Sequence, residues 1–327
     1  MTGVPAMPTL VAAHEPTIYF IGVTTGQSSI LSVFPRWAAE LKLGPSKIVG
    51  IDLPLHASQE AYRRVVSFIK ADPLSRGALV TTHKIDLFAA CRDLFDEVDS
   101  LADLMGEQSC LSKADGKLIA SAKDPISAGL ALEAFLLPTH FARTEADLFC
   151  MGAGGSTIAI SWYLTRQERG ANRPSRVIVS NRSQARLDSI RRIHESFGVG
   201  VPAEYMIAPN PEDNDRLMAA LKVGSLVINA TGLGKDAPGS PITNAGVFPN
   251  AGLAWELNYR GDLLFLRQAR AAATPRKLTV EDGCTYFLHG WTRVIASVFN
   301  VSIPPSGPVF ERLSELAGGR PLLERVS

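Results

Sequence analysis

A glycine-rich segment, Met151-Gly-Ala-Gly-Gly-Ser156, directly follows an apolar run and directly precedes a helical pattern. Glycines at such a place let the backbone approach a pyrophosphate without a Cβ in the way, and the helix N-terminus offers free N–H groups to the anion. Thr157 occupies the last position of the usual GxGxxG spacing, so the strand–loop–helix context carries the interpretation. An ordinary glycine-rich connection is the alternative. The predicted phosphate-binding residues are Gly152, Ala153, Gly154, Gly155 and Ser156.

Two arginines follow the next apolar run, Val177–Val179. A site for NAD usually has an Asp or Glu here to bind the ribose 2′-hydroxyl, whereas this chain has Asn181-Arg-Ser183 and then Arg186. Guanidinium groups suit a 2′-phosphate through charge-assisted, forked hydrogen bonds. Solvated arginines beside a helix-capping Ser183 are the alternative, and the cap is compatible with either. The pattern predicts NADP rather than NAD, bound by Asn181, Arg182, Ser183 and Arg186.

A third small turn, Asn229-Ala-Thr-Gly-Leu-Gly234, follows the apolar run 226–228. Ligands of open α/β sheets bind at the carboxyl ends of the strands, although such a turn can also lack a ligand. Beside the two other loops it is predicted to complete the cofactor site through Asn229, Ala230, Thr231 and Gly234.

Short apolar runs alternate with helical patterns along the chain, which indicates β-α units and largely parallel sheets. Asp115-Gly116, between two strand-like runs, predicts a hairpin that makes the first sheet mixed. A helix is expected from Pro125 to Leu137, with Asp124 as its cap. Further strands are expected at 17–21, 47–51, 78–80, 148–151, 177–179, 226–228 and 253–257, and helices at 29–43, 61–70, 155–170, 184–197 and from 284.

These patterns predict an α/β protein with two domains. Residues 1–137 would form a mixed-sheet α/β substrate domain, completed by C-terminal helices 284–327. Residues 138–283 would form a doubly wound Rossmann domain that binds the dinucleotide.

Composition excludes several classes of protein. The chain has 327 residues, with 33 basic and 32 acidic side chains, so a nucleic-acid partner is not expected. No apolar run reaches the ~18–20 residues of a membrane span, and no cationic start marks a secretory signal. The four cysteines lack metal-ligand spacing and are expected to be reduced, mostly buried thiols: Cys91, Cys110, Cys150 and Cys284. We expect a cytoplasmic enzyme, a monomer or homodimer, with a small-molecule substrate and no metal.

The order of these motifs resembles that of the shikimate dehydrogenase family over roughly residues 17–300. The matching elements are Val80-Thr-x-His-Lys84, Asp115-Gly116 with Asp124 downstream, Gly152–Ser156, Asn181–Ser183, Asn229–Gly234 and Asp282-Gly283. The resemblance implies a substrate domain, an NADP-binding Rossmann domain, a cleft between them, and a catalytic Lys–Asp pair. That pair falls on Lys84 and Asp124.

The predicted catalytic pair makes chemical sense. Lys84 would lie in the first turn of a helix, where the helix dipole disfavours a positive charge. A lysine whose neutral form is favoured can exchange a proton with an alcohol as hydride leaves. Asp124 could hold the ammonium and the reacting hydroxyl. A solvated lysine and a simple helix cap are the alternatives.

The substrate side departs from the family pattern. The family's Ser-x-Ser element, which grips a ring carboxylate, falls on Ser28 and Ile30, and its C-terminal glutamine falls on Gly290. Because each lost contact leaves a substrate group unpaired on burial, a related cyclic or polyhydroxylated alcohol or ketone is favoured over shikimate. The predicted substrate-binding residues are Ser28, Thr82, Ser109 and Tyr259. Further candidates, for which structural roles are equally open, are Lys123, His83 and His289.

The sequence therefore favours an NADP-dependent oxidoreductase that interconverts a secondary alcohol and a ketone on a small polar substrate. Two other functions stay open. One is a non-catalytic NADPH-binding regulator that lost its substrate contacts, and the other is a dehydrogenase of a folate-type one-carbon substrate.

Overall fold

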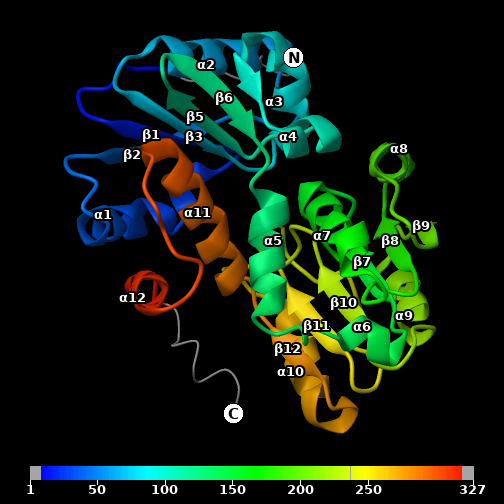
Figure 1. The fold of residues 1–327 in the computed structure, drawn as a ribbon. Coiled ribbons are helices and arrows are strands. Elements are labelled where there is room, and N and C mark those ends of the chain that lie inside the picture. Colours follow the sequence, from blue (N-terminus) through cyan, green and yellow to red (C-terminus); the bar gives the residue numbers. More distant parts are fainter. Residues whose placement is uncertain (1–8, 236, 319–327) are drawn as a thin grey trace. The chain divides into compact units, whose positions relative to one another are not determined.

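The computed structural model describes residues 9–235 and 237–318, and the chain divides into two compact units (Figure 1). Among the described residues, 9–123 with 290–318 form the first unit, and 124–235 with 237–289 form the second. From the sequence, the boundaries were expected after residues 137 and 283, so the segments 124–137 and 284–289 lie in a different unit from the one expected.

The first unit contains a mixed sheet, as predicted. Its strands lie in the order β2-β1-β3-β5-β6-β4. The strand β1 is parallel to both β2 and β3, β5 is antiparallel to β3 and β6, and β4 is parallel to β6. The bounds are β1 (Thr17–Gly22), β2 (Lys47–Asp52), β3 (Ser75–Val80), β4 (Glu97–Val98), β5 (Cys110–Ala114) and β6 (Lys117–Ser121).

A tight turn joins β5 to β6, where Ala114 pairs with Lys117. Asp115 and Gly116 both have positive φ, 51° and 76°. A two-residue type I′ turn needs this backbone at both positions, which Asp-Gly accommodates. The predicted hairpin is therefore confirmed.

Helices of the first unit present apolar stripes to this sheet. In α2 the buried side chains Tyr62, Val65, Val66 and Ile69 recur at helical spacing and share a core with β1. The ring of Trp291 packs edge-to-face on the ring of Phe20 in β1, with 5.1 Å between the ring centroids. The bounds are η1 (Thr25–Gln27), α1 (Ile30–Glu40), α2 (Gln59–Ala71), α3 (Lys84–Cys91), η2 (Arg92–Leu94), α4 (Ser100–Met105), α11 (Cys284–Phe299) from residue 290 on, and α12 (Pro308–Leu316).

The second unit contains a fully parallel sheet in the order β9-β8-β7-β10-β11-β12. The chain starts in the middle at β7, winds outward to β9, and then winds outward from β10 to β12, which is the doubly wound Rossmann order. The predicted Rossmann unit is therefore confirmed. The bounds are β7 (Leu148–Met151), β8 (Val177–Asn181), β9 (Ala203–Ile207), β10 (Leu226–Asn229), β11 (Leu253–Glu256) and β12 (Thr279–Glu281).

The helix α5 packs against α7 in this unit (Figure 1). Gly129 makes the contact possible, because a Cβ there would lie 2.1 Å from the ring of Tyr163. The Tyr163 hydroxyl also donates a hydrogen bond to Glu133. These contacts explain why α5 belongs with the second unit. The bounds are α5 (Asp124–Glu133), α6 (His140–Thr144), α7 (Gly155–Thr165), η3 (Gln167–Arg169), α8 (Gln184–Phe197), α9 (Pro211–Ala219) and α10 (Leu264–Arg276).

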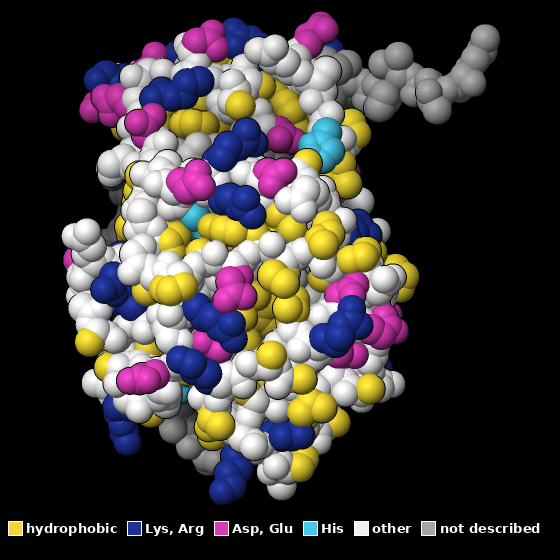
Figure 2. Space-filling model, turned by 90° about the vertical axis from the view of Figure 1, so that its right-hand side faces the viewer, with side chains coloured by type: hydrophobic (Ala, Val, Ile, Leu, Met, Phe, Trp, Pro, Cys, Tyr) yellow, Lys and Arg dark blue, Asp and Glu magenta, His cyan; other side chains and the backbone are white. Residues whose placement is uncertain are grey.

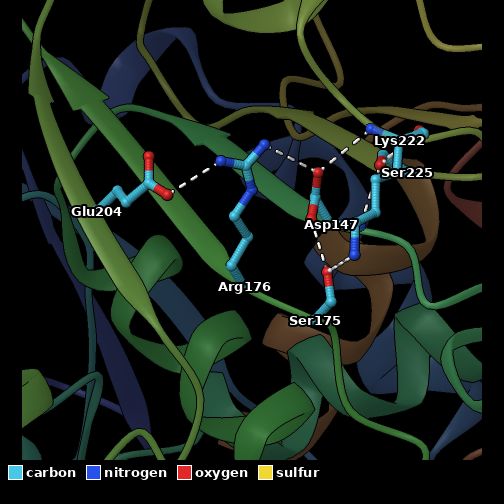
Figure 3. A network of polar contacts seen from close by, with 6 residues as sticks. All are labelled: Asp147, Ser175, Arg176, Glu204, Lys222 and Ser225. Atoms are coloured by element: carbon cyan, nitrogen blue, oxygen red, sulfur yellow. Dashed lines mark hydrogen bonds and ion pairs between the residues drawn. The ribbon is translucent and has the colours of Figure 1, made fainter.

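A polar network ties the amino ends of the parallel strands together (Figure 3). Asp147, whose side chain is fully buried, accepts hydrogen bonds from the Ser175 hydroxyl at 2.7 Å and from Arg176 at 3.2 Å. Arg176 also pairs with Glu204 of β9 at 3.0 Å. Burial alone would raise the pKa of Asp147, but these donors and the Lys222 N–H hold that pKa below its usual value.

Replacing Asp147 with alanine is expected to lower the free energy of unfolding by about 3 kcal/mol, because Arg176 and two further donors lose their acceptor. Thermal and urea unfolding measure this. Glu204→Gln, at the exposed end of the same network, is expected to change stability by less than about 1 kcal/mol. Equal losses in both variants would contradict a central role for Asp147.

On the molecular face in Figure 2, basic and acidic side chains are interspersed. This distribution matches the near-balance of 33 basic and 32 acidic residues in the whole chain. Cys91, Cys110 and Cys150 are buried thiols, and Cys284 is half-buried.

Candidate cofactor site and active site

The predicted cofactor residues lie at one edge of the second unit's sheet. They follow the carboxyl ends of β7, β8 and β10, and parallel strands bring these ends to the same side. The structure therefore brings together three loops that are about 30 to 50 residues apart in sequence.

The glycine-rich loop after β7 is built for close backbone approach. Gly152 has φ +113°, and a Cβ there would lie 2.6 Å from the carbonyl oxygen of Ala230 in the loop after β10. The Thr157 hydroxyl donates to the Gly152 carbonyl at 2.6 Å. Gly154 is the N-cap of α7, and a Cβ on it would meet nothing within 4 Å. The N-terminus of α7 is thus open to an anion.

Tyr286, at the start of α11, adds a contact to this loop that the sequence analysis did not predict. Its hydroxyl donates to the Ser156 hydroxyl at 3.3 Å, and its ring packs edge-to-face on Trp255 at a centroid distance of 5.6 Å. Tyr286, Ser156 and Trp255 all belong to the second unit.

Two alanine substitutions separate the folding role of the loop from its binding role. Gly152→Ala is expected to lower both stability and NADPH affinity, because it strains φ and drives a Cβ into Ala230. Gly154→Ala is expected to keep the melting temperature and weaken NADPH binding about tenfold or more, because its Cβ blocks only the approach of the phosphate. Melting curves and NADPH titration test this. Wild-type affinity in Gly154→Ala would contradict the phosphate site.

The loop after β8 presents two arginines and, in the first turn of α8, no acidic residue. Arg182 is exposed and Arg186 is half-buried. Ser183 is the N-cap of α8, but its side chain makes no cap hydrogen bond, so the predicted hydroxyl cap is wrong. The Asn181 side-chain oxygen instead accepts the Ser183 N–H at 2.9 Å, which closes a turn around Arg182.

The loop after β10 is shaped by buried side-chain hydrogen bonds. Asn229 is fully buried, and its side-chain oxygen accepts from the Thr231 N–H at 3.0 Å and from the Thr231 hydroxyl at 2.6 Å. Gly234 has φ +87°, and its carbonyl accepts the Leu263 N–H at 3.3 Å. The turn is therefore held from both ends.

A buried carboxylate lies beneath this loop, and the sequence analysis did not include it in the site. Glu256 ends β11 with no exposed surface. Burial raises its pKa to about 7, against the opposing effect of hydrogen bonds from Asn258 and Asn229. One sequence feature could have pointed to Glu256: it is a charged residue at the end of an otherwise apolar strand, Leu253-Ala-Trp-Glu256.

In the first unit, the loops that carry Ser28 and Lys84 lie at one sheet edge. The parallel strands β1 and β3 both end there, and a Cβ on Gly22 would lie 3.0 Å from Thr81 and 3.1 Å from Thr25. Thr25 is anchored to the Asp52 carboxylate through its N–H at 2.7 Å and its hydroxyl at 2.6 Å. Ser28 follows that anchored turn and is 8% exposed.

The backbone before Lys84 is strained. Thr82 has φ +49°, a conformation that a β-branched residue rarely adopts and that is often found at functional sites. His83 is buried, and its Nδ1 lies 3.0 Å from the Tyr62 hydroxyl. Burial lowers the pKa of His83, so this imidazole is neutral at pH 7. Lys84, half-buried, begins α3 as predicted.

Ser109 is joined to the end of β3, because the Val80 N–H donates to its carbonyl at 2.9 Å. Its hydroxyl accepts the Lys123 N–H at 2.8 Å. The preceding residues Glu107 and Gln108 are fully buried, and the Gln108 N–H donates to the Lys84 carbonyl at 3.4 Å. The structure therefore brings Ser28, Thr82, Lys84 and Ser109 to one edge of the first unit and adds two buried polar side chains there.

The remaining predicted residues lie in the second unit. Asp124 is the first residue of α5 and is 8% exposed. The Tyr259 ring packs on Phe287 at a centroid distance of 4.3 Å, and His289 is buried. Lys84 and Asp124 thus begin helices in different units, and their pairing stays a prediction.

Among the described residues, no group of three or more His, Cys, Asp and Glu side chains could hold a metal ion. In the same part of the chain, no helix is long and apolar enough to cross a membrane.

The sheet order and the glycine-lined edge define a two-unit α/β protein whose second unit has the Rossmann topology. No protein-family model and no curated protein matches the chain. Solved structures of the same architecture do match it, with TM-scores above 0.6 over most of both chains.

One is shikimate 5-dehydrogenase from Thermus thermophilus in complex with NADP(H) and shikimate, at 22% identity and TM-score 0.65, covering 92% of this chain and 99% of that one. Another is the Listeria monocytogenes shikimate 5-dehydrogenase in complex with shikimate and NAD, at 16% identity and TM-score 0.67, covering 94% and 97%. A third is the ligand-free 5-ketofructose reductase of a Gluconobacter species, at 14% identity and TM-score 0.63, covering 92% and 98%. At these identities the likeness shows that the chain has the shikimate dehydrogenase fold.

Proposed function

We propose that this chain is an NADP-dependent oxidoreductase that interconverts a secondary alcohol and a ketone on a small cyclic or polyhydroxylated substrate. The observation that carries the proposal is the carboxyl edge of the Rossmann sheet. There, the open N-terminus of α7 would bind the pyrophosphate of NADP, and the arginines before and within α8 would bind its 2′-phosphate.

The cofactor preference rests on charge. Arg182 and Arg186 stand where an NAD site would have an acidic residue, and the first turn of α8 has none. Two solved relatives in fold support a nicotinamide cofactor, since one is in complex with NADP(H) and the other with NAD. When bound, the nicotinamide supplies or accepts the hydride.

The proton is assigned to Lys84. Its place in the first turn of α3 disfavours the ammonium form through the helix dipole, and the strained Thr82 and the buried His83 directly precede it. An amine that gives up its proton readily can act as general acid for the ketone or general base for the alcohol. We assign Asp124 to hold that amine and the reacting hydroxyl.

The substrate class rests on the polar groups of the first unit and on Tyr259. Ser28 and Ser109 are hydroxyl groups at the edge that bears Lys84, and the Ser109 hydroxyl already accepts the Lys123 N–H. A hydroxyl both donates and accepts hydrogen bonds, as the hydroxyl groups of a polyhydroxylated substrate require. Ile30 replaces the second serine of the family's carboxylate-binding pair, which weakens the case for a substrate that presents a carboxylate there. One relative in fold is a 5-ketofructose reductase, which adds support for a polyhydroxylated ketone.

Screening tests the proposal. The protein is mixed with NADPH and cyclic ketones, keto forms of cyclitols or sugar-derived ketones, and NADPH oxidation is followed by absorbance. We expect turnover with at least one polyhydroxylated ketone and a strong preference for NADPH over NADH. NADPH binding without turnover of any of these would favour the regulator instead. Protection from thermal unfolding by pterins, and not by polyols, would favour the folate-type substrate.

A further inference from the structure

A buried hydrogen-bond network joins Glu256 to both ends of the loop after β10. One carboxylate oxygen of Glu256 accepts the Asn258 N–H at 2.9 Å, and the other accepts the Asn229 side-chain amide at 2.8 Å. The Asn258 side chain in turn donates to the carbonyls of Thr231 and Leu233 at 3.2 and 3.1 Å. Glu256 therefore lies at the centre of the contacts that shape residues 229–234.

The orientation of each amide is fixed by backbone donors. The Asn229 side-chain oxygen is committed to the Thr231 N–H and hydroxyl, so its NH₂ group must face Glu256. Both Glu256 oxygens are therefore acceptors. The hydroxyl oxygen of a protonated carboxyl is a weaker acceptor than a carboxylate oxygen, so a proton on Glu256 weakens one of these hydrogen bonds. The network is therefore strongest with an ionised carboxylate.

The loop that Glu256 supports belongs to one half of the predicted cofactor site. In the sheet order, β10 and β11 lie on the opposite side of β7 from β8. The β8 side carries the arginines assigned to the adenosine phosphate, so the β10–β11 side faces the nicotinamide half of a dinucleotide. Ala230 of this loop also touches Gly152 of the phosphate loop.

We propose that Glu256 is a positioning residue for the cofactor, and that its carboxylate holds the 229–234 loop in the binding shape only while it is ionised. This inference rests on the proposed function, because it concerns the same cofactor site. It predicts that cofactor affinity changes with the protonation of one buried group away from the reacting atoms.

The electrostatic setting places that protonation near neutral pH. Burial raises the pKa of Glu256 to about 7, while hydrogen bonds from Asn258 and Asn229 and the positive charge of Lys235 act in the opposite direction. Below this pH the carboxyl gains a proton and a hydrogen bond that shapes the loop is weakened. Affinity for the cofactor should therefore fall as the pH falls through about 7.

The test compares the NADPH affinity of the wild type and Glu256→Gln between about pH 6 and pH 8. Glutamine offers one acceptor and one donor, so it mimics the protonated carboxyl at every pH. We expect wild type to bind NADPH about tenfold more tightly than Glu256→Gln at pH 8, since one buried hydrogen bond is restored, and about equally at pH 6. The 2′-phosphate of the cofactor has a pKa near 6 and titrates in the same pH range. Its titration affects both variants equally, so its effect cancels in the ratio of the two affinities.

Two further variants serve as controls. Glu204→Gln changes a carboxylate of the same sheet that pairs with Arg176 at the amino edge, and it should follow the wild type at each pH. Glu256→Asp keeps the charge but shortens the side chain, so it should bind more weakly and still respond to pH. It keeps the inference testable if Glu256→Gln does not fold.

The outcomes separate the two proposals. An affinity ratio that is the same at both ends of the pH range would overturn the positioning role of Glu256 and leave the proposed function intact. No NADPH binding by wild type at any pH would overturn the proposed function, and this inference with it.

Thermal unfolding without cofactor gives a second test, because the direction in which stability changes with pH can be predicted. Because the folded-state pKa lies above the ordinary carboxyl value, the wild type should lose stability as the pH rises to about 7. Glu256→Gln should not show this loss. Parallel pH profiles of the two melting temperatures would contradict a titrating Glu256.

Discussion

Turnover in Lys84→Ala is expected to fall by about 10²–10⁴-fold, the contribution of a positioned general acid or base. The expected cause is loss of the amine that exchanges a proton with the substrate oxygen as hydride moves. NADPH affinity should stay near wild type, because the predicted phosphate and adenosine contacts all lie in the second unit. Steady-state kinetics with the substrate found by screening, together with NADPH titration, measure both quantities.

Two further lysine variants test whether the Lys84 amine itself is responsible for the loss of turnover. Lys84→Met retains the length of the side chain without the amine and should be as slow as the alanine variant. Lys70→Ala removes a lysine that pairs with Asp96 at the surface, and it should keep wild-type turnover. Unchanged turnover in Lys84→Met would show that the amine has no part in the chemistry.

The double variant Arg182→Ala/Arg186→Ala is expected to lose about 10²-fold or more in NADPH affinity, since charge-assisted hydrogen bonds to a phosphate contribute about 1.5–3 kcal/mol each. NADH carries no 2′-phosphate, so its affinity should change little. The preference for NADPH over NADH would therefore largely disappear, which titration of both dinucleotides measures.

Arg192→Ala is the matched control, because Arg192 is exposed on the same helix, further from its N-terminus. It should retain the full preference for NADPH. If the double variant and Arg192→Ala lose affinity for NADPH and NADH alike, the arginines contribute only general positive charge and the assignment to the 2′-phosphate is wrong.

Features governed by local backbone chemistry could be predicted from the sequence. The hairpin follows from Asp115-Gly116, because both residues accept the positive φ of its turn. The tight glycine-rich turn after β7 follows from Gly152, whose φ and close approach to Ala230 exclude a side chain; its binding of phosphate stays a prediction. The two sheets follow from the alternation of apolar runs and helical patterns.

Features governed by long-range packing were missed. The helix α5 is buried on most sides, including at Ser127, Ala128 and Gly129, so its sequence does not reveal which unit it joins. The edge strand β9 is only half-buried and lacks a clear alternation. In the sequence, Glu256 is simply the last residue of an apolar strand. Its partner Asn229 lies beside it because β10 and β11 pair in parallel, and this pairing is not visible in the sequence.

A crystal structure of the protein with NADP⁺ bound would show both the cofactor contacts and the position of the Lys84 amine. We expect the pyrophosphate on the N–H groups of Gly154–Ser156 and the 2′-phosphate within hydrogen-bond distance of Arg182 or Arg186. We also expect the nicotinamide on the β10–β11 side, with the Lys84 amine directed toward its reactive carbon. If the 2′-phosphate lies in bulk solvent, or the Lys84 amine is directed away from the nicotinamide, the proposed enzyme mechanism is wrong.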